Sequence, residues 1–237
     1  MEQVSFWAIK FITQQTDKQH PFLRFLAYDA PGNSYLLPNN EEYDQQQSVP
    51  DIELNRQKHI ASVEHLDGDI GMLMNLLKPT NHLKNTLIFF SSGSGGNLKT
   101  VASNGNWRGS KNDLYEGGIR VPTCLYWKGK IKKESICHQI AMTMDIFPTL
   151  CILTETLTTI DFDGVSVSKS ILENEPLQEE RTLFWIRPDA TMHYQPIDYA
   201  IRKGVCKLIK NSPDDDFELY NLTTDPYEQT PLRTSSD

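Results

Sequence analysis

Cysteine and histidine can act as nucleophiles, bases or metal ligands, and in this sequence both are scattered. The four cysteines stand singly, without a Cys-x-x-Cys pair, and no two of the six histidines have a His-x-x-x-His spacing. The sequence therefore predicts neither a zinc site nor a thioredoxin-like motif. We interpret the cysteines as buried or half-buried free thiols, with a Cys124–Cys137 disulfide as the alternative in an oxidising compartment.

A long polar segment, residues 91–118, is a better place for chemistry. It is rich in glycine, serine and asparagine and has no apolar periodicity, so we predict a loop. A loop of this length inside a compact domain is usually functional.

Apolar runs on either side of this loop predict the elements that hold it. Residues 22–28, 86–91 and 120–127 are short apolar runs, typical of strands buried on both faces. Residues 55–77 carry one apolar stripe at helical spacing, and Pro79 follows where such a helix would end. Strand, long helix and strand in this order predict a βαβ crossover in a parallel sheet. Further helices are predicted at 4–15 and 140–153.

The character of the sequence changes after about Gly164. Short apolar runs joined by turn-rich links then predict a small antiparallel meander, with strands at 182–186, 199–203, 205–210 and 217–222. We therefore predict an α/β chain: part of a doubly wound, mostly parallel sheet flanked by helices, plus a small C-terminal antiparallel sheet. The division is residues 1–164 for the larger α/β domain and 165–237 for the smaller subdomain.

Composition narrows the classes of partner. The chain of 237 residues has a formal net charge of -8 and a pI of about 5.3. Nucleic acid and anionic membrane surfaces are therefore not expected as partners, because the average surface would repel them. No apolar stretch approaches the length of a transmembrane helix, and Met1–Trp7 does not have the pattern of a signal peptide.

Several segments resemble the sulfatase family. Asn85–Gly96 (NTLIFFSSGSGG) resembles the family segment in which a strand ends in Ser-Asp-Asn-Gly-Gly, and Arg108–Pro122 (RGSKNDLYEGGIRVP) resembles an Arg-Gly-Gly-Lys…Glu-Gly-Gly-Ile-Arg-Val-Pro signature. Shorter matches follow at 127–131, 144–150, 163–165, 207–210 and 218–229. The resemblance covers nearly the whole chain and corresponds to the C-terminal portion of the family.

The resemblance implies a fold and a chemistry. Sulfatases are grouped with the alkaline phosphatases, and they use a calcium ion and a formylglycine nucleophile. The family nucleophile, two of its aspartate metal ligands and further basic residues lie in an N-terminal half that these 237 residues do not contain. The second pair of metal ligands is an Asp-Asn after the strand that ends near Ser91.

This sequence departs from the family at two places and keeps one site residue. The metal-ligand positions are Gly93 and Ser94, so no metal site or cofactor is expected in this chain, because calcium sites are built mainly from carboxylates and carbonyls. Gly32 stands where the family commonly has a histidine that touches the sulfate. Lys111 matches the family lysine that reaches the sulfate as a point charge. It is our candidate catalytic and substrate-binding residue, and we interpret it as a remnant of the family's sulfate site. Asn97 and Asn104, the nearest substitute ligands, are interpreted as turn residues.

The other matched residues are interpreted as structural. Glu116–Gly118 and Arg120 predict a turn with an internal ion pair, and Asp145 predicts a helix or turn cap. Of the histidines, His138 and His193 lie in segments whose counterparts, by the resemblance, approach the family's cleft. Asn221-Leu-Thr223 is a glycosylation sequon, relevant if the chain is exported.

Three hypotheses follow from these residues. The chain is a sulfuric ester hydrolase by resemblance that is inactive alone; or it is one chain of a split sulfatase; or it is a pseudoenzyme acting as a binding or scaffold module. The implied partners are a separate sulfatase N-terminal half or a second copy of the chain, with a sulfate ester as substrate only when the site is completed. No compartment is predicted, although family members are usually exported or lysosomal.

Overall fold

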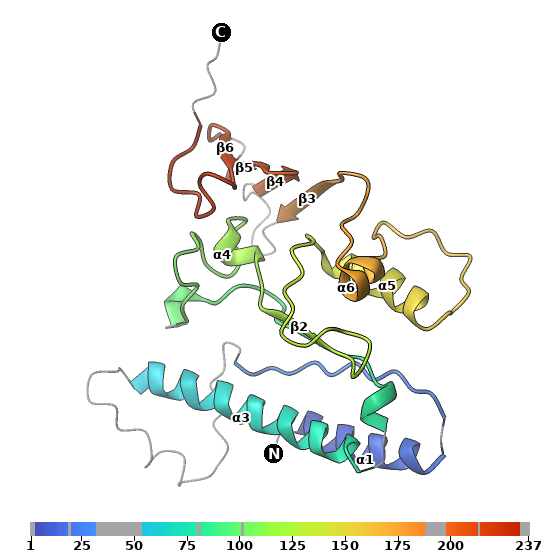
Figure 1. The fold of residues 1–237 in the computed structure, drawn as a ribbon. Coiled ribbons are helices and arrows are strands. Elements are labelled where there is room, and N and C mark those ends of the chain that lie inside the picture. The colour runs from blue at the N-terminus through green and yellow to red at the C-terminus, as the bar shows by residue number, and fades with distance from the viewer. Residues whose placement is uncertain are drawn as a thin grey trace.

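The computed structural model describes residues 3–18, 20–31, 54–79, 82–100, 102–187, 198–212 and 214–232. It is a mixed α/β arrangement, in which two long helices lie at one end and a small four-stranded sheet lies at the other (Figure 1). The α/β class and the C-terminal antiparallel sheet agree with the prediction. None of the described helices has both the length and the apolar character that a membrane-crossing segment requires.

The two long helices pack on each other and form the first core. Helix α1 spans Gln3–Lys18 and helix α3 spans Leu54–Leu77, so both predicted helices are confirmed. The core cluster is made of apolar side chains that both helices bury, namely Ala8, Ile12, Leu73 and Leu77 together with Leu83 from the short 3-10 helix His82–Asn85. Within this layer the Ser5 hydroxyl donates to the Asp69 carboxylate at 2.5 Å, so the one buried charge on α3 has a partner.

The predicted strand at 22–28 is not a strand. This segment runs beside the helices without ladder pairing, and Phe22 and Leu26 pack on the helical core while Leu23 and Phe25 are 73% and 86% exposed. An apolar run predicts burial, but a strand also needs a neighbour that takes its backbone hydrogen bonds. No described strand lies beside this one.

The parallel pairing of the next two strands was also predicted wrongly. Strand β1 (Ile88–Ser91) and strand β2 (Thr123–Tyr126) form a two-stranded antiparallel sheet, in which Ile88 pairs with Tyr126 and Ser91 with Thr123. The connection between them is the long loop, which reverses the chain without a crossover helix. The doubly wound parallel sheet is therefore not seen in the described part of the chain.

The third predicted helix, 140–153, begins six residues late as an α-helix. A 3-10 turn at Thr143–Asp145 leads into helix α5, Ile146–Leu153, which packs on helix α6, Ser168–Glu173. The buried Asp145 carboxylate accepts hydrogen bonds from the backbone N–H groups of Met142 (2.6 Å) and Val165 (2.9 Å) and from the Arg181 guanidinium. The interpretation of Asp145 as a turn cap is confirmed, and it also ties together three segments that lie far apart in the sequence.

This arrangement makes the stability of the chain depend on pH. Burial opposes ionisation of Asp145, but the hydrogen bonds from Arg181, Met142 and Val165 outweigh it and lower the pKa of the carboxyl group. A carboxyl group with a lowered folded-state pKa stabilises the fold above its unfolded-state pKa of about 3.9 and loses that contribution as pH falls through the lower value. We expect Asp145→Asn to reduce the free energy of unfolding by about 2 kcal/mol at pH 7, and the difference from wild type to shrink below pH 4. Urea titrations at several pH values measure this. The exposed Asp161→Asn is the control, and an Asp145→Asn difference that does not change with pH would contradict the assignment.

The C-terminal meander is confirmed strand by strand. Strands β3 (Thr182–Arg187), β4 (Asp198–Lys203), β5 (Cys206–Lys210) and β6 (Glu218–Asn221) pair antiparallel in this order. Alternate residues of a strand point to opposite faces. One face, here called the inner face, is buried and holds Leu183, Ala200, Ile209 and Tyr220. The inner face lies on α4, Glu116–Ile119, and thereby on the long loop (Figure 1).

Candidate functional site

The candidate site begins where β1 ends. Gly93 is exposed, and a Cβ atom added to it would meet no atom within 4 Å. The hydroxyl of Ser94 donates to the carbonyl of Gly95 at 3.2 Å. The two positions that the resemblance assigns to metal ligands therefore offer one hydroxyl and no carboxylate, which does not fit calcium, whose sites rely on charged oxygen ligands.

The loop closes back on the end of β1 through backbone contacts. Lys111 N donates to Gly96 O at 2.9 Å, and Gly95 N donates to Gly118 O at 2.8 Å. The approach at Gly95 is so close that an added Cβ atom would lie 1.8 Å from the carbonyl oxygen of Gly117. Glycine at these positions is what allows the two segments to touch, and their contact brings Lys111 beside the residues that follow β1.

Asn104 holds the inside of this loop together. Its side-chain amide donates to the carbonyls of Gly96 (3.1 Å) and Gly109 (2.9 Å), and its oxygen accepts from Gly96 N at 2.8 Å. The oxygen of Asn97 accepts from Lys99 N at 3.0 Å. Both asparagines act locally on backbone groups, as the turn interpretation predicts.

Lys111 itself is half-buried at a turn of the loop. Among the described residues, no hydrogen bond or ion pair is recorded for its ammonium group. An unpaired cation on a fixed backbone can neutralise an anionic oxygen without first breaking an ion pair. Gly32 and His193 lie outside the described residues, and His138 is exposed.

A buried cluster of charges anchors the loop to the inner face of the sheet. The Lys207 ammonium group, which is fully buried, lies 3.0 Å from Glu116 Oε1 and 2.8 Å from Glu228 Oε1. Glu228 also accepts from the backbone N–H of Glu116 at 2.6 Å, and Arg202 lies 3.6 Å from Glu116. Burial raises the pKa of the Glu228 carboxyl group, against the opposing effect of Lys207. The predicted Glu116–Arg120 ion pair is present at 3.6 Å, but it is the weaker, more exposed part of this cluster.

A second polar network fixes Arg108, the first residue of the signature-like segment. Its guanidinium donates to Tyr220 Oη (2.7 Å) and Glu218 (3.2 Å) and lies 3.9 Å from the centre of the Tyr115 ring. Burial raises the pKa of Tyr115 to about 12, so this hydroxyl stays protonated and donates to Glu218 at 2.8 Å.

The sequence reasoning missed both anchors. Lys207, Glu218 and Glu228 lie in segments quoted for the resemblance, and this was the available signal. Their partners, however, are about 90 to 112 residues away along the chain. The Arg108–Gly118 segment is thus held to the C-terminal sheet by the buried charges of Lys207, Glu116 and Glu228 and by the partly exposed Arg108–Glu218 pair.

The described histidine, cysteine, aspartate and glutamate side chains do not form a metal-binding cluster. Within the described ranges, no three His, Cys, Asp or Glu side chains could jointly hold a metal ion. All four cysteines are free thiols; Cys151 is buried as interpreted, whereas the other three are exposed.

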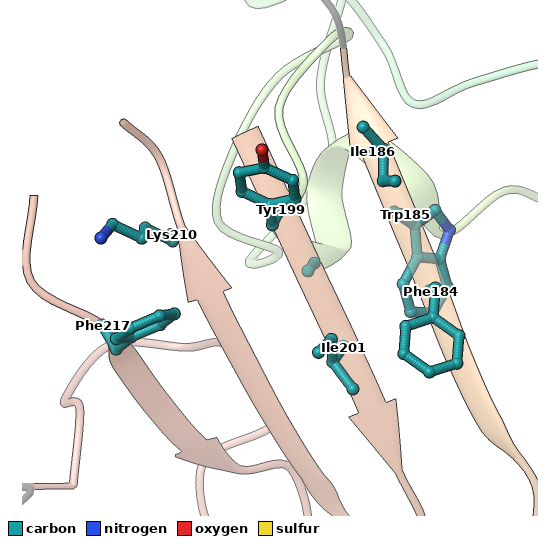
Figure 2. Close-up of a pocket in the computed structure, with 8 residues that line it drawn as sticks. Phe184, Trp185, Ile186, Tyr199, Ile201, Lys210 and Phe217 are labelled. Atoms are coloured by element: carbon teal, nitrogen blue, oxygen red, sulfur yellow. The ribbon is translucent and has the colours of Figure 1, made fainter. Parts of the chain in front are cut away.

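A hollow of about 410 Å³ lies on the opposite, outer face of the sheet (Figure 2). Phe184, Ile186 and Ile201 line it together with Tyr199, Phe217 and Lys210. Its lining residues include no carboxylate, histidine, serine or cysteine side chain.

Comparison with known proteins gives consistent matches. The sequence model of the family described as Sulfatase matches residues 5–156, and that described as N-sulphoglucosamine sulphohydrolase, C-terminal, matches residues 106–236. N-acetylgalactosamine-6-sulfatase of Homo sapiens is 26% identical and aligns with 97% of this chain and 47% of its own length. A sulfatase of Formosa agariphila is 28% identical, over 94% of this chain and 44% of its own.

Solved structures agree. The crystal structure of Ps i-CgsB superposes with a TM-score of 0.85 at 26% identity, covering 97% of this chain and 49% of that one, and the same protein has been solved in complex with k-i-k-neocarrahexaose. The chain spans about half the length of the curated relatives it matches.

Proposed function

This chain belongs to the sulfatase family, and we propose that it forms the Lys111 side of a sulfuric ester hydrolase site and does not hydrolyse a sulfate ester by itself. The observation that carries the proposal is the contact between the Lys111 segment and the residues after β1, made by Lys111 N and Gly96 O at 2.9 Å. It joins the two segments whose family counterparts hold the sulfate and the metal ion.

The chemistry available to these residues is limited to charge neutralisation. Cleavage of a sulfate ester needs a nucleophile, a dication that orients it, and cations that stabilise the charge on the sulfuryl oxygens. Lys111 can serve as one such cation. The other two requirements are not met by Gly93, Ser94 or the described groups around them.

A sulfate group on a sugar is the substrate class we propose. The names of the relatives support it, since one acts on N-acetylgalactosamine 6-sulfate by its name, a second family name refers to N-sulphoglucosamine, and a structural neighbour was solved with an oligosaccharide.

We also propose that the larger domain, residues 1–164, associates with a sulfatase N-terminal half or with a second copy of the chain. Apolar side chains at its surface support this, with Phe6 53%, Trp7 46% and Phe90 39% exposed. Apolar groups gathered on a surface favour protein–protein contact. Strand β1 also lacks a described partner on the side away from β2 and could accept another strand.

Catalysis tests the main proposal. We expect the purified chain, with millimolar calcium, to turn over an aryl sulfate ester no faster than buffer, and a sulfatase N-terminal half added in trans to co-elute with it. Gly93→Asp with Ser94→Asn should be tolerated sterically, because the space around Gly93 is open. The doubly changed chain alone stays inactive, but paired with the N-terminal half it should gain calcium-dependent turnover that Lys111→Ala removes.

Two outcomes separate the alternatives. Calcium-dependent turnover by the wild-type pair would favour the split enzyme and would show that Gly93 is not disabling. Specific retention of the chain on a sulfated oligosaccharide, lost in Lys111→Ala but kept in the exposed Lys132→Ala control, would favour the pseudoenzyme acting as a binding module. Hydrolysis by the wild-type chain alone, abolished by Lys111→Ala, would overturn the proposal.

A further inference from the structure

One motif has no part in the proposed function. The sequence contains a single Asn-x-Ser/Thr sequon, Asn221-Leu-Thr223, with leucine at its centre. Such a sequon is the acceptor signal for N-linked glycans on surface loops of exported proteins. Whether the motif can carry a glycan depends on where the fold puts its asparagine.

The strand register puts Asn221 on the outer face of the C-terminal sheet. Asn221 is the last residue of β6, which is an edge strand, and it pairs with Cys206 of β5. The preceding pair, Tyr220 with Lys207, is buried on the inner face. Because neighbouring residues of a strand point to opposite faces, Asn221 faces away from the Arg108–Gly118 loop and from the buried charges.

The neighbours of Asn221 on that face are polar. Its register row continues from Cys206 to Lys203 and then to Thr182, whereas the next row, Leu219, Leu208, Ile201 and Phe184, is apolar. The antiparallel bridge with Leu232 that covers the edge of β6 is made at Leu219, two residues before the sequon. A sugar attached at Asn221, which is half-buried, would therefore meet the polar end of the sheet.

The side chains of the sequon are already in a turn. Asn221 Oδ1 accepts a hydrogen bond from Thr223 N at 3.0 Å, an Asx-turn in which the asparagine orients the residue two positions on. Thr223 is exposed. Among the described residues no hydrogen bond is recorded for Asn221 Nδ2, so a substituent on this nitrogen breaks no hydrogen bond among them.

We propose that Asn221 is the acceptor of an N-linked glycan when the chain passes through a secretory membrane. In the transfer, Asn221 Nδ2 forms a bond to the anomeric carbon of a lipid-pyrophosphate-linked oligosaccharide. The bond between that carbon and the pyrophosphate oxygen breaks, the lipid pyrophosphate leaves with the electron pair, and the amide loses one proton. This proposal does not rest on the sulfatase chemistry.

The test uses the full chain with a cleavable secretory leader in a eukaryotic host. Peptide N-glycosidase F is expected to produce one discrete increase in mobility and to convert Asn221 to aspartate, as read by peptide mass spectrometry. Asn221→Gln and Thr223→Ala should each abolish the shift, whereas Thr223→Ser, which keeps a hydroxyl, should retain it. Thr224→Ala is the matched control, since it removes a neighbouring exposed threonine and leaves the sequon intact.

The result can be read whether or not a variant folds. Transfer occurs on translocated chains, so the protease-protected membrane fraction is analysed together with the secreted protein. Unmodified wild-type chain in both fractions would overturn the proposal, and so would a glycan that persists in Asn221→Gln.

Discussion

Replacing Lys207 by alanine is expected to lower the free energy of unfolding by about 3–5 kcal/mol, the cost of removing one partner from a buried ion pair. The Lys207 ammonium group is fully buried and lies within 3.0 Å of two carboxylates, Glu116 and Glu228. Without it, two negative charges would face each other out of contact with water, opposed only by the more distant Arg202 and Arg120, each 3.6 Å from Glu116, among the described residues. Urea denaturation followed by circular dichroism measures the change.

Two controls make this prediction specific. Lys203→Ala removes an exposed lysine from the outer face of the same sheet and should change stability by less than about 0.5 kcal/mol. Lys207→Met combined with Glu116→Gln and Glu228→Gln removes the charges together and should recover part of the loss. A cost below about 1 kcal/mol for Lys207→Ala would show that the cluster does not anchor the loop as described.

Gly95→Ala is the second substitution for which we expect a large effect. The added methyl group would lie 1.8 Å from the carbonyl oxygen of Gly117 and 2.9 Å from the Cα of Gly118, so the backbone must move. That movement breaks the hydrogen bond from Gly95 N to Gly118 O. We expect destabilisation of about 3 kcal/mol, at the upper end of the cost of overpacking.

The matched control is two residues away. Gly93→Ala adds the same methyl group where no atom lies within 4 Å, and its effect should stay within about 0.5 kcal/mol. Chemical denaturation of both variants checks the pair. Equal effects would mean that the closure of the loop on the end of β1 is not tight, and the positioning of Lys111 would then lose its support.

Local patterns in the sequence were enough to predict several elements of the fold. The periodicity of apolar residues predicts α1, α3 and α5, because one buried face imposes a helical repeat. The short apolar runs and the turn-rich links after Gly164 predict the four strands of the meander. The segment Arg108–Pro122 indicates the family, because many residue types recur there in one order.

Features that depend on partners distant along the chain could be seen only in the folded protein. Residues 22–28 have the composition of a strand, yet they are not one, because no described strand lies beside them to take their hydrogen bonds. The direction of β2 relative to β1 depends on the path of a loop of about thirty residues, which apolar patterns do not record.

The burial of Lys207 could not be predicted either, since a lysine is buried only where opposite charges meet it. Its partner Glu116 lies 91 residues away along the chain. The position of Lys111 beside the end of β1 follows from the close contacts of Gly95 with Gly117 and Gly118. Such contacts form only when the chain has folded.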